Sequence, residues 1–78
     1  MTQLDKLIGK IKARPAYADF GEVQTLLEAF GWRLDRQAGS HAVFTKPGEF
    51  VIGVPKHHGR RVKRVYLDRI CERLGLDG

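Results

Sequence analysis

A histidine and a dense run of basic residues are the parts of this sequence that could do chemistry. His41 follows Gly39-Ser40, a turn signal, and opens a segment, residues 41–46, that reads as a β-strand. An imidazole titrates at about pH 6.5, so it can accept or donate a proton under cellular conditions. Cleavage of RNA through its own 2′-hydroxyl needs such a group, together with positive charge near the phosphate. The residues alone leave two interpretations of His41 open, a catalytic acid or base and an ordinary surface histidine.

Positive charge is concentrated just before and within the last predicted helix. Six basic residues face a single acid, Asp68, between residues 56 and 69. Helical spacing predicts that Arg60, Lys63 and Arg64 lie on one side of the helix start, where backbone N–H groups also attract phosphate. The residues that we expect to contact RNA are Ser40, Lys56, His57, His58, Arg60, Arg61, Lys63 and Arg64. The alternative is a solvated basic face without a ligand, and the two adjacent histidines could serve solubility alone.

Length and composition limit the classes of protein. The chain has 78 residues, which is enough for a single domain over 1–78, and its net charge of +5 favours nucleic acid as the partner. Cys71 is the only cysteine, so neither an internal disulfide nor a zinc site of the usual kind is expected. Glu49 is the only acid between Asp35 and Asp68, which leaves no carboxylate cluster for a two-metal nuclease. We therefore expect no metal and no cofactor.

The N-terminal segment predicts neither export nor membrane insertion. Charged residues interrupt residues 1–12, so no apolar stretch is long enough for a signal peptide or a membrane span. We expect a cytoplasmic protein without a membrane partner. The same segment predicts a helix over 2–14, because Leu4, Leu7, Ile8 and Ile11 share one face. Thr2 is the expected cap of this helix, and Pro15 is expected to end it.

A second helix and three strands follow in the expected order. Asp19 and Glu22 form a capping pattern, and Gly31 is suited to the left-handed end of the helix. The apolar period then falls to two, which predicts strands over 32–37, 41–46 and 50–54 joined by Gly-containing turns. Strand alternation places Trp32 and Phe44 in the core and His41 on the opposite face.

The last helix completes the expected architecture. A polar basic loop is predicted over 56–61, followed by a helix whose apolar face consists of Val62, Val65, Tyr66, Ile70 and Leu74. Three strands with short turns favour an antiparallel sheet that packs one face on helices. The fold class is therefore α+β, a two-layer sandwich in which a three-stranded antiparallel sheet carries helices on one face. The position of the first helix does not follow from the sequence.

Four short motifs, in order, resemble the HicA family of toxin–antitoxin ribonucleases over residues 19–76. The helix 23–30 followed by Gly31-Trp32 is similar to the family's opening, and Arg36-Gln37-Ala38-Gly39-Ser40-His41 is similar to its arginine and Gly-Ser-His signature. Phe44 stands where the family has an aromatic residue, and Val54-Pro55 followed by His57 or His58 resembles a third motif. Residues 62–70 are similar to the closing helix.

This resemblance implies both a fold and an activity. It implies a double-stranded-RNA-binding-domain-like α-β-β-β-α fold over 19–76, with residues 1–15 as an additional N-terminal helix. It also implies a metal-independent endoribonuclease that cleaves mRNA, with His41 in the catalytic position and a cognate antitoxin that masks the site. Many relatives have a second histidine where this chain has Ala42. The alternatives are a non-catalytic RNA-binding module of the same fold and a domain whose charge meets an acidic protein partner.

Overall fold

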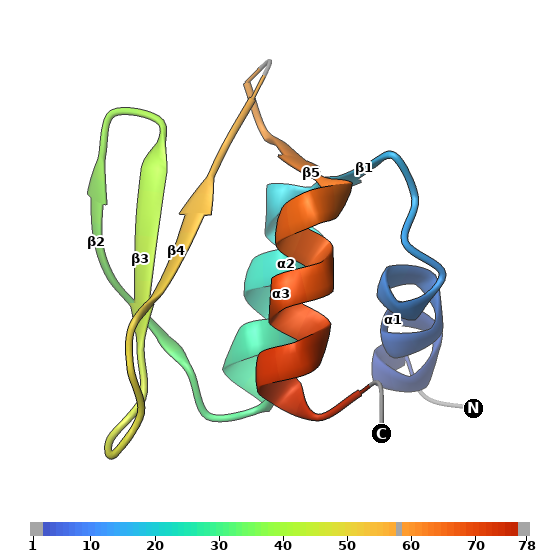
Figure 1. Ribbon diagram of the computed structural model, residues 1–78, viewed down its shortest axis with the longest axis horizontal. Coiled ribbons are helices and arrows are strands. Elements are labelled where there is room, and N and C mark those ends of the chain that lie inside the picture. The colour runs from blue at the N-terminus through green and yellow to red at the C-terminus, as the bar shows by residue number, and fades with distance from the viewer. Residues whose placement is uncertain (1–2, 58, 77–78) are drawn as a thin grey trace.

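The computed structural model describes residues 3–57 and 59–76 as an α+β fold, which confirms the expected class (Figure 1). Its elements in chain order are α1 (Gln3–Lys12), β1 (Tyr17–Asp19), α2 (Phe20–Ala29), β2 (Arg33–Ala38), β3 (His41–Thr45), β4 (Ile52–Pro55), β5 (Arg61–Lys63) and α3 (Arg64–Leu74). None of the helices within the described residues has the length and apolarity needed to cross a membrane.

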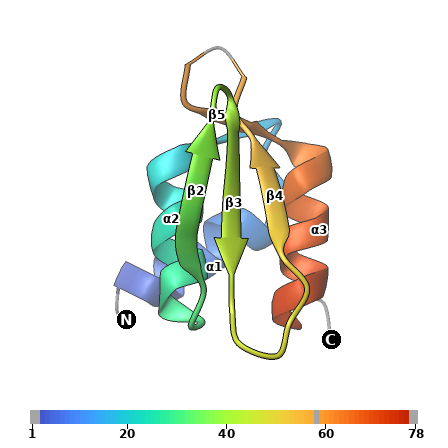
Figure 2. The ribbon, with the colours of Figure 1, turned by 90° about the vertical axis from the view of Figure 1, so that its left-hand side faces the viewer.

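The main sheet is three-stranded and antiparallel, in the order β2-β3-β4. One face packs against α2 and α3, and no described helix covers the other face (Figures 1 and 2). We call this uncovered side the outer face of the sheet. Trp32 and Phe44 lie in the core, 2% and 0% exposed, as the alternation predicted. Burial of such aromatic rings contributes much of the stability of a small domain.

The third strand is shorter than predicted at its start. The structure begins β4 at Ile52, whereas the sequence predicted a strand from residue 50. Before Ile52 the chain instead contacts the last helix, where the Arg73 guanidinium donates a hydrogen bond of 2.6 Å to the Phe50 carbonyl. That carbonyl is therefore occupied by a helix side chain, and the Phe50 side chain remains 87% exposed.

A second, two-stranded sheet was not predicted. β1 pairs with β5, with Ala18 opposite Val62, and both of these side chains are buried. The sequence analysis was wrong to place Val62 on the face of the last helix, because that residue lies in β5 and the helix begins at Arg64. Arg60, Lys63 and Arg64 were expected on one side of the helix start, but only Arg64 lies in the helix. Two three-residue strands carry too little periodicity to be recognised locally.

Helix α1 forms a layer on the far side of α2 and α3 from the main sheet (Figure 1). Ile11 is fully buried there, and two ion pairs join α1 and the turn after it to their neighbours, Lys10 to Glu22 at 2.7 Å and Arg14 to Asp68 at 2.6 Å. The predicted end at residue 14 was wrong, because the helix ends at Lys12 and Arg14 has a left-handed backbone. The predicted cap, Thr2, lies outside the described residues.

Helix α2 begins and ends as predicted. The Asp19 side chain accepts a hydrogen bond from the Gly21 backbone at 2.8 Å. The Glu22 side chain accepts one from the Asp19 backbone amide, which completes a capping box. Gly31 has φ 91°, a left-handed conformation that a residue with a Cβ adopts only with strain. The cap fixes where α2 begins, and the start of α2 lies next to the part of the molecule that carries the candidate site.

Candidate nucleic-acid interface and active site

Three segments that are distant in the sequence meet at one edge of the molecule. The Lys56 amide donates a hydrogen bond of 2.7 Å to the Ser40 carbonyl, which joins the end of β4 to the turn between β2 and β3. The Phe20 amide donates one of 2.7 Å to the Arg60 carbonyl, which joins the loop before β5 to the start of α2. We call this region the basic edge, defined by Ser40, His41, Lys56, Arg60, Arg61, Lys63 and Arg64.

His41 lies where the basic edge meets the outer face of the sheet. It is the first residue of β3, its Cα partners are Ala38 and Pro55, and its side chain is exposed. Ala42 and Phe44 alternate with it and are buried, so His41 faces away from the core as predicted. Its imidazole makes no hydrogen bond with any described residue, which leaves both ring nitrogens accessible to a ligand.

Aromatic rings hold several of the cations at the basic edge. Lys56 Nζ lies 4.8 Å and Arg60 Cζ 5.7 Å from the centroid of the Phe20 ring. Arg61 Cζ lies 5.8 Å from the Tyr17 ring, on the neighbouring strand β1. Such contacts stabilise a cation without neutralising it. Arg60 also approaches the Asp19 carboxylate, but at 4.0 Å between exposed groups this ion pair contributes little.

The start of α3 adds two further cations, and its first amide, that of Arg64, donates a hydrogen bond of 3.1 Å to the Ala16 carbonyl. Lys63 is the N-cap residue and makes no side-chain capping bond, and the first turn holds no acid. Lys63 and Arg64 are both exposed, and neither makes an ion pair within the described part of the chain. Positive charge opposes the helix dipole here, so a bound phosphate would be favoured both by the two cations and by the positive end of the helix dipole.

Comparison with known proteins assigns the chain to a family. The model of a family described as the HicA toxin of bacterial toxin-antitoxin systems matches residues 20–76, most of the chain. The chain belongs to the HicA toxin family. It matches no curated protein and no solved structure. In this HicA-family chain the match begins at the first residue of α2 and includes the main sheet, β5 and α3, whereas α1 lies outside it.

The position after His41 differs from that of many HicA relatives but does not alter the outer face. Ala42 is fully buried, and its Cα partners are Gln37 and Val54. In this fold a side chain at position 42 therefore points into the core, away from His41. The absence of a second histidine removes no group from the face on which His41 lies.

The structure gives His57 a packing role that the sequence did not indicate. Its ring stacks on Tyr66 at 6.3 Å between centroids, and its backbone exchanges two hydrogen bonds with Arg61, of 2.7 and 2.9 Å. Nε2 is buried without a hydrogen-bond partner among the described residues. His57 thus fixes the loop that carries the cations, and its contact with RNA stays a prediction. His58, the other histidine predicted to contact RNA, lies outside the described residues.

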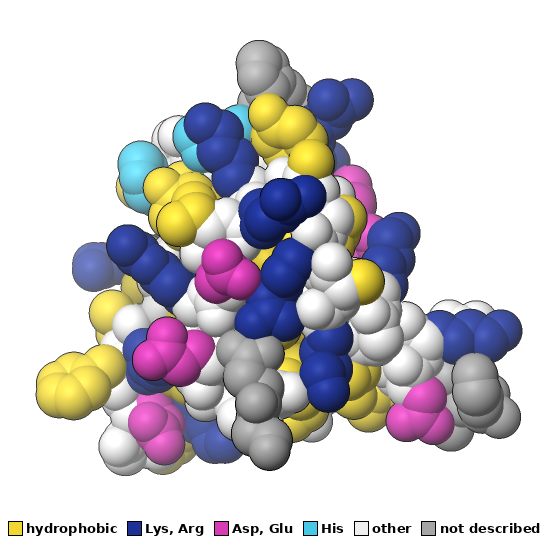
Figure 3. All heavy atoms as spheres, turned by 45° about the vertical axis from the view of Figure 1, so that its right-hand side comes forward, with side chains coloured by type: hydrophobic (Ala, Val, Ile, Leu, Met, Phe, Trp, Pro, Cys, Tyr) yellow, Lys and Arg dark blue, Asp and Glu magenta, His cyan; other side chains and the backbone are white. Residues whose placement is uncertain are grey.

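Basic side chains lie next to the described histidines at one end of the molecule. Figure 3 shows the visible histidine side chains next to Lys and Arg side chains at the upper end of the molecule. Among the described residues, no group of three or more His, Cys, Asp or Glu side chains could hold a metal ion.

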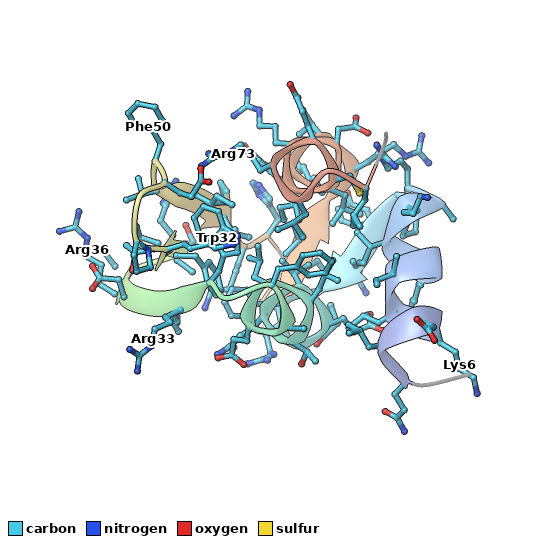
Figure 4. The ribbon with its side chains drawn as sticks, turned by 90° about the horizontal axis from the view of Figure 1, so that it is seen from below. Lys6, Trp32, Arg33, Arg36, Phe50 and Arg73 are labelled. Atoms are coloured by element: carbon cyan, nitrogen blue, oxygen red, sulfur yellow. The ribbon has the colours of Figure 1, made fainter. Side chains whose placement is uncertain are left out.

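Two exposed arginines of β2 were not assigned a role from the sequence. Figure 4 shows Arg33 and Arg36 projecting away from the body of the protein, on the side of the sheet. Arg36 belongs to the motif that ends in His41, and this motif was the only signal that pointed to it. Regular alternation along the strand would place Arg36 on the same face as Trp32 and Leu34, but the register of β2 shifts between Leu34 and Arg36.

Proposed function

We propose that this HicA-family protein is a toxin-type endoribonuclease that cleaves mRNA, with His41 as the general acid or base and the basic edge as the phosphate-binding site. One observation carries the proposal. An exposed imidazole lies at the edge where cations from the loop before β5 and from the start of α3 converge. The assignment to a toxin family supports the same activity.

The chemistry matches what these side chains can supply. The RNA 2′-oxygen attacks the neighbouring phosphorus, its proton departs, and the bond from phosphorus to the 5′-oxygen breaks as that oxygen takes up a proton. His41 would exchange a proton with one of these two oxygens. The cations of the basic edge would stabilise the negative charge that develops on the phosphate. Because RNA supplies its own nucleophile, the protein needs no activated serine or cysteine.

The decisive test compares His41→Ala with Lys6→Ala, a change at an exposed residue of α1 on the far side of the molecule from the sheet. We expect the wild type and Lys6→Ala to arrest growth when expressed from a tight promoter and to cleave single-stranded RNA in EDTA. His41→Ala should do neither. Equal activity of His41→Ala and the wild type would refute the assignment of His41, and loss of cleavage in EDTA would refute the metal-independent mechanism.

A non-catalytic RNA-binding module is the second candidate. It is favoured by one observation: no described side chain orients the His41 imidazole, whereas catalytic bases are usually held by a partner. Steeply salt-dependent RNA binding without cleavage at any RNA concentration would support this alternative.

A cognate antitoxin is the proposed protein partner, because the family consists of toxins of toxin-antitoxin systems. An antitoxin that masks the basic edge would compete with RNA for the same cations. We expect the product of an adjacent antitoxin-like gene to displace RNA from the His41→Ala protein. Simultaneous binding of RNA and antitoxin would show that the antitoxin covers another surface.

A further inference from the structure

The outer face of the main sheet is flat, uncovered and bordered by cations. Directly paired residues of antiparallel strands share a face. The register therefore places Arg36, Val43 and Gly53 in one row across the outer face. The next row contains His41, between Ala38 and Pro55, and Arg33 opposite Thr45 occupies the row on the other side. A side chain at Gly53, on the edge strand β4, would meet nothing within 4 Å, so this end of the row is open.

A β-bulge brings Arg36 onto this face. Leu34 pairs with Phe44 and faces the core, so regular alternation would also turn Arg36 toward the core. The register shift between Leu34 and Arg36 instead pairs Arg36 with Val43, whose neighbours along β3, Ala42 and Phe44, are buried. Bulges commonly redirect a side chain next to a functional site. Here the bulge places a guanidinium on the same face as the imidazole of His41.

Arg36 and His41 are diagonal neighbours on adjacent strands. The pairing from Arg36 to Val43 and from Ala38 to His41 is regular, and diagonal pairs have Cα atoms about 7–8 Å apart, within reach of a long side chain. Arg36 is exposed and makes neither a hydrogen bond nor an ion pair with any residue in the described ranges. Arg36 therefore lies beside His41 without making a polar contact that would stabilise the fold.

We propose that the outer face of the sheet binds the RNA strand and that Arg36 binds a phosphate adjacent to the one on which His41 acts. The inference rests on the proposed function for the identity of the ligand. Charge complementarity and continuity with His41 both favour RNA, since the only acid of β2, β3 and β4 is Asp35, at the bulge. An extended single strand fits a face that is open at Gly53. Arg33, farther along the same strand, extends the cationic border away from His41.

Salt dependence of binding provides the sharpest test. In the cleavage-deficient His41→Ala background, the affinity for a short unstructured RNA is measured by fluorescence anisotropy over a series of salt concentrations. Each lost phosphate contact should reduce the slope of log Kobs against log[salt] by about 0.7 for a single strand. Arg36→Gln should show this reduction and bind more weakly at low salt by roughly tenfold or more, the loss expected for a hydrogen bond between charged groups. Arg36→Lys should keep the slope.

Lys6→Gln is the matched control. It removes the same charge from an exposed residue of α1, on the far side of the molecule from Arg36 (Figure 4). We expect it to leave both slope and affinity close to those of the His41→Ala parent. The two variants carry the same net charge. A difference between their RNA affinities or salt slopes therefore reports a local contact of Arg36 and not the total charge of the protein.

Equal slopes and affinities for Arg36→Gln and Lys6→Gln would overturn the inference. An Arg36→Gln protein that binds RNA normally but loses its antitoxin would also overturn it, since the outer face would then bind protein. Failure of the proposed function is distinguishable, because cleavage is measured on the wild type. A wild type that does not cleave, together with a reduced slope for Arg36→Gln, would refute the ribonuclease and retain this RNA contact.

Discussion

Replacement of Phe20 by leucine tests how the fold holds the cations of the basic edge. The Phe20 ring is 3% exposed and lies 6.0 Å from the Phe44 ring, with the Lys56 and Arg60 cations over it. Each cation–π contact is worth about 0.5–1 kcal/mol at an exposed site. The aromatic pair adds about 0.5–1.5 kcal/mol beyond its buried area. Leucine retains an apolar side chain but no ring, so we expect a ring-specific loss of about 1.5–3.5 kcal/mol in the free energy of unfolding.

Urea unfolding followed by circular dichroism measures this loss, with Phe30→Leu as the control. Phe30 is partly buried against the same core but makes no ring or cation contact among the described residues. Both variants remove the same atoms, so the larger loss expected for Phe20→Leu reports its ring contacts together with its deeper burial. A loss of this size is a large fraction of the roughly 5–15 kcal/mol that stabilises a typical domain.

A double-mutant cycle separates the two kinds of ring contact. In a background in which Lys56 and Arg60 are replaced by methionine, the cost of Phe20→Leu should fall by about 1–2 kcal/mol, the share of the two cation–π contacts. The pair with Phe44 should remain. Equal losses for Phe20→Leu and Phe30→Leu, or an unchanged cost in the methionine background, would refute the view that the ring holds these cations.

Two other expectations concern stability. Asp19→Ala removes the capping box of α2 and should cost about 1 kcal/mol, whereas Asp35→Ala at the exposed bulge should change stability by less than about 0.5 kcal/mol; urea midpoints compare them. Equal midpoints would contradict the role of the cap. Ala42→His should cost about 1–3 kcal/mol because position 42 is fully buried, and Val43→His on the outer face should cost clearly less. A stable Ala42→His protein would show that the core has room there.

Elements with strong local signals could be predicted from the sequence. Helix α2 combines a capping pattern, a regular apolar face and a glycine at its end, and each of these depends on residues within one or two helical turns. The core-facing side of β3 followed from the alternation of Ala42 and Phe44, and this alternation also placed His41 on the opposite face. The face of a strand on which a histidine lies can thus be predicted from the residues next to it.

Features that depend on long-range pairing could not be predicted. β1 and β5 are separated by more than 40 residues and have three residues each. Strands this short show no hydrophobic period from which their pairing could be predicted. The bulge in β2 was not predicted either, because residues 33–38 contain only Leu34 and Ala38 as apolar positions, and only the partner strand reveals the shift between Leu34 and Arg36. Regular alternation from Leu34 would therefore place Arg36 on the wrong face. The position of α1 likewise depends on faces of α2 and α3 that exist only after folding.

Backbone hydrogen bonds, more than side chains, set the geometry of the candidate site. The amide of Lys56 bonds to Ser40, the amide of Phe20 bonds to the carbonyl of Arg60, and His57 and Arg61 bond to each other in both directions. His41 itself is fixed by its strand partners, not by its imidazole. Replacement of an exposed cation or of His41 therefore removes a functional group and leaves its neighbours in place. Differences in RNA affinity or cleavage among such variants can accordingly be interpreted as lost contacts, provided that their urea midpoints agree.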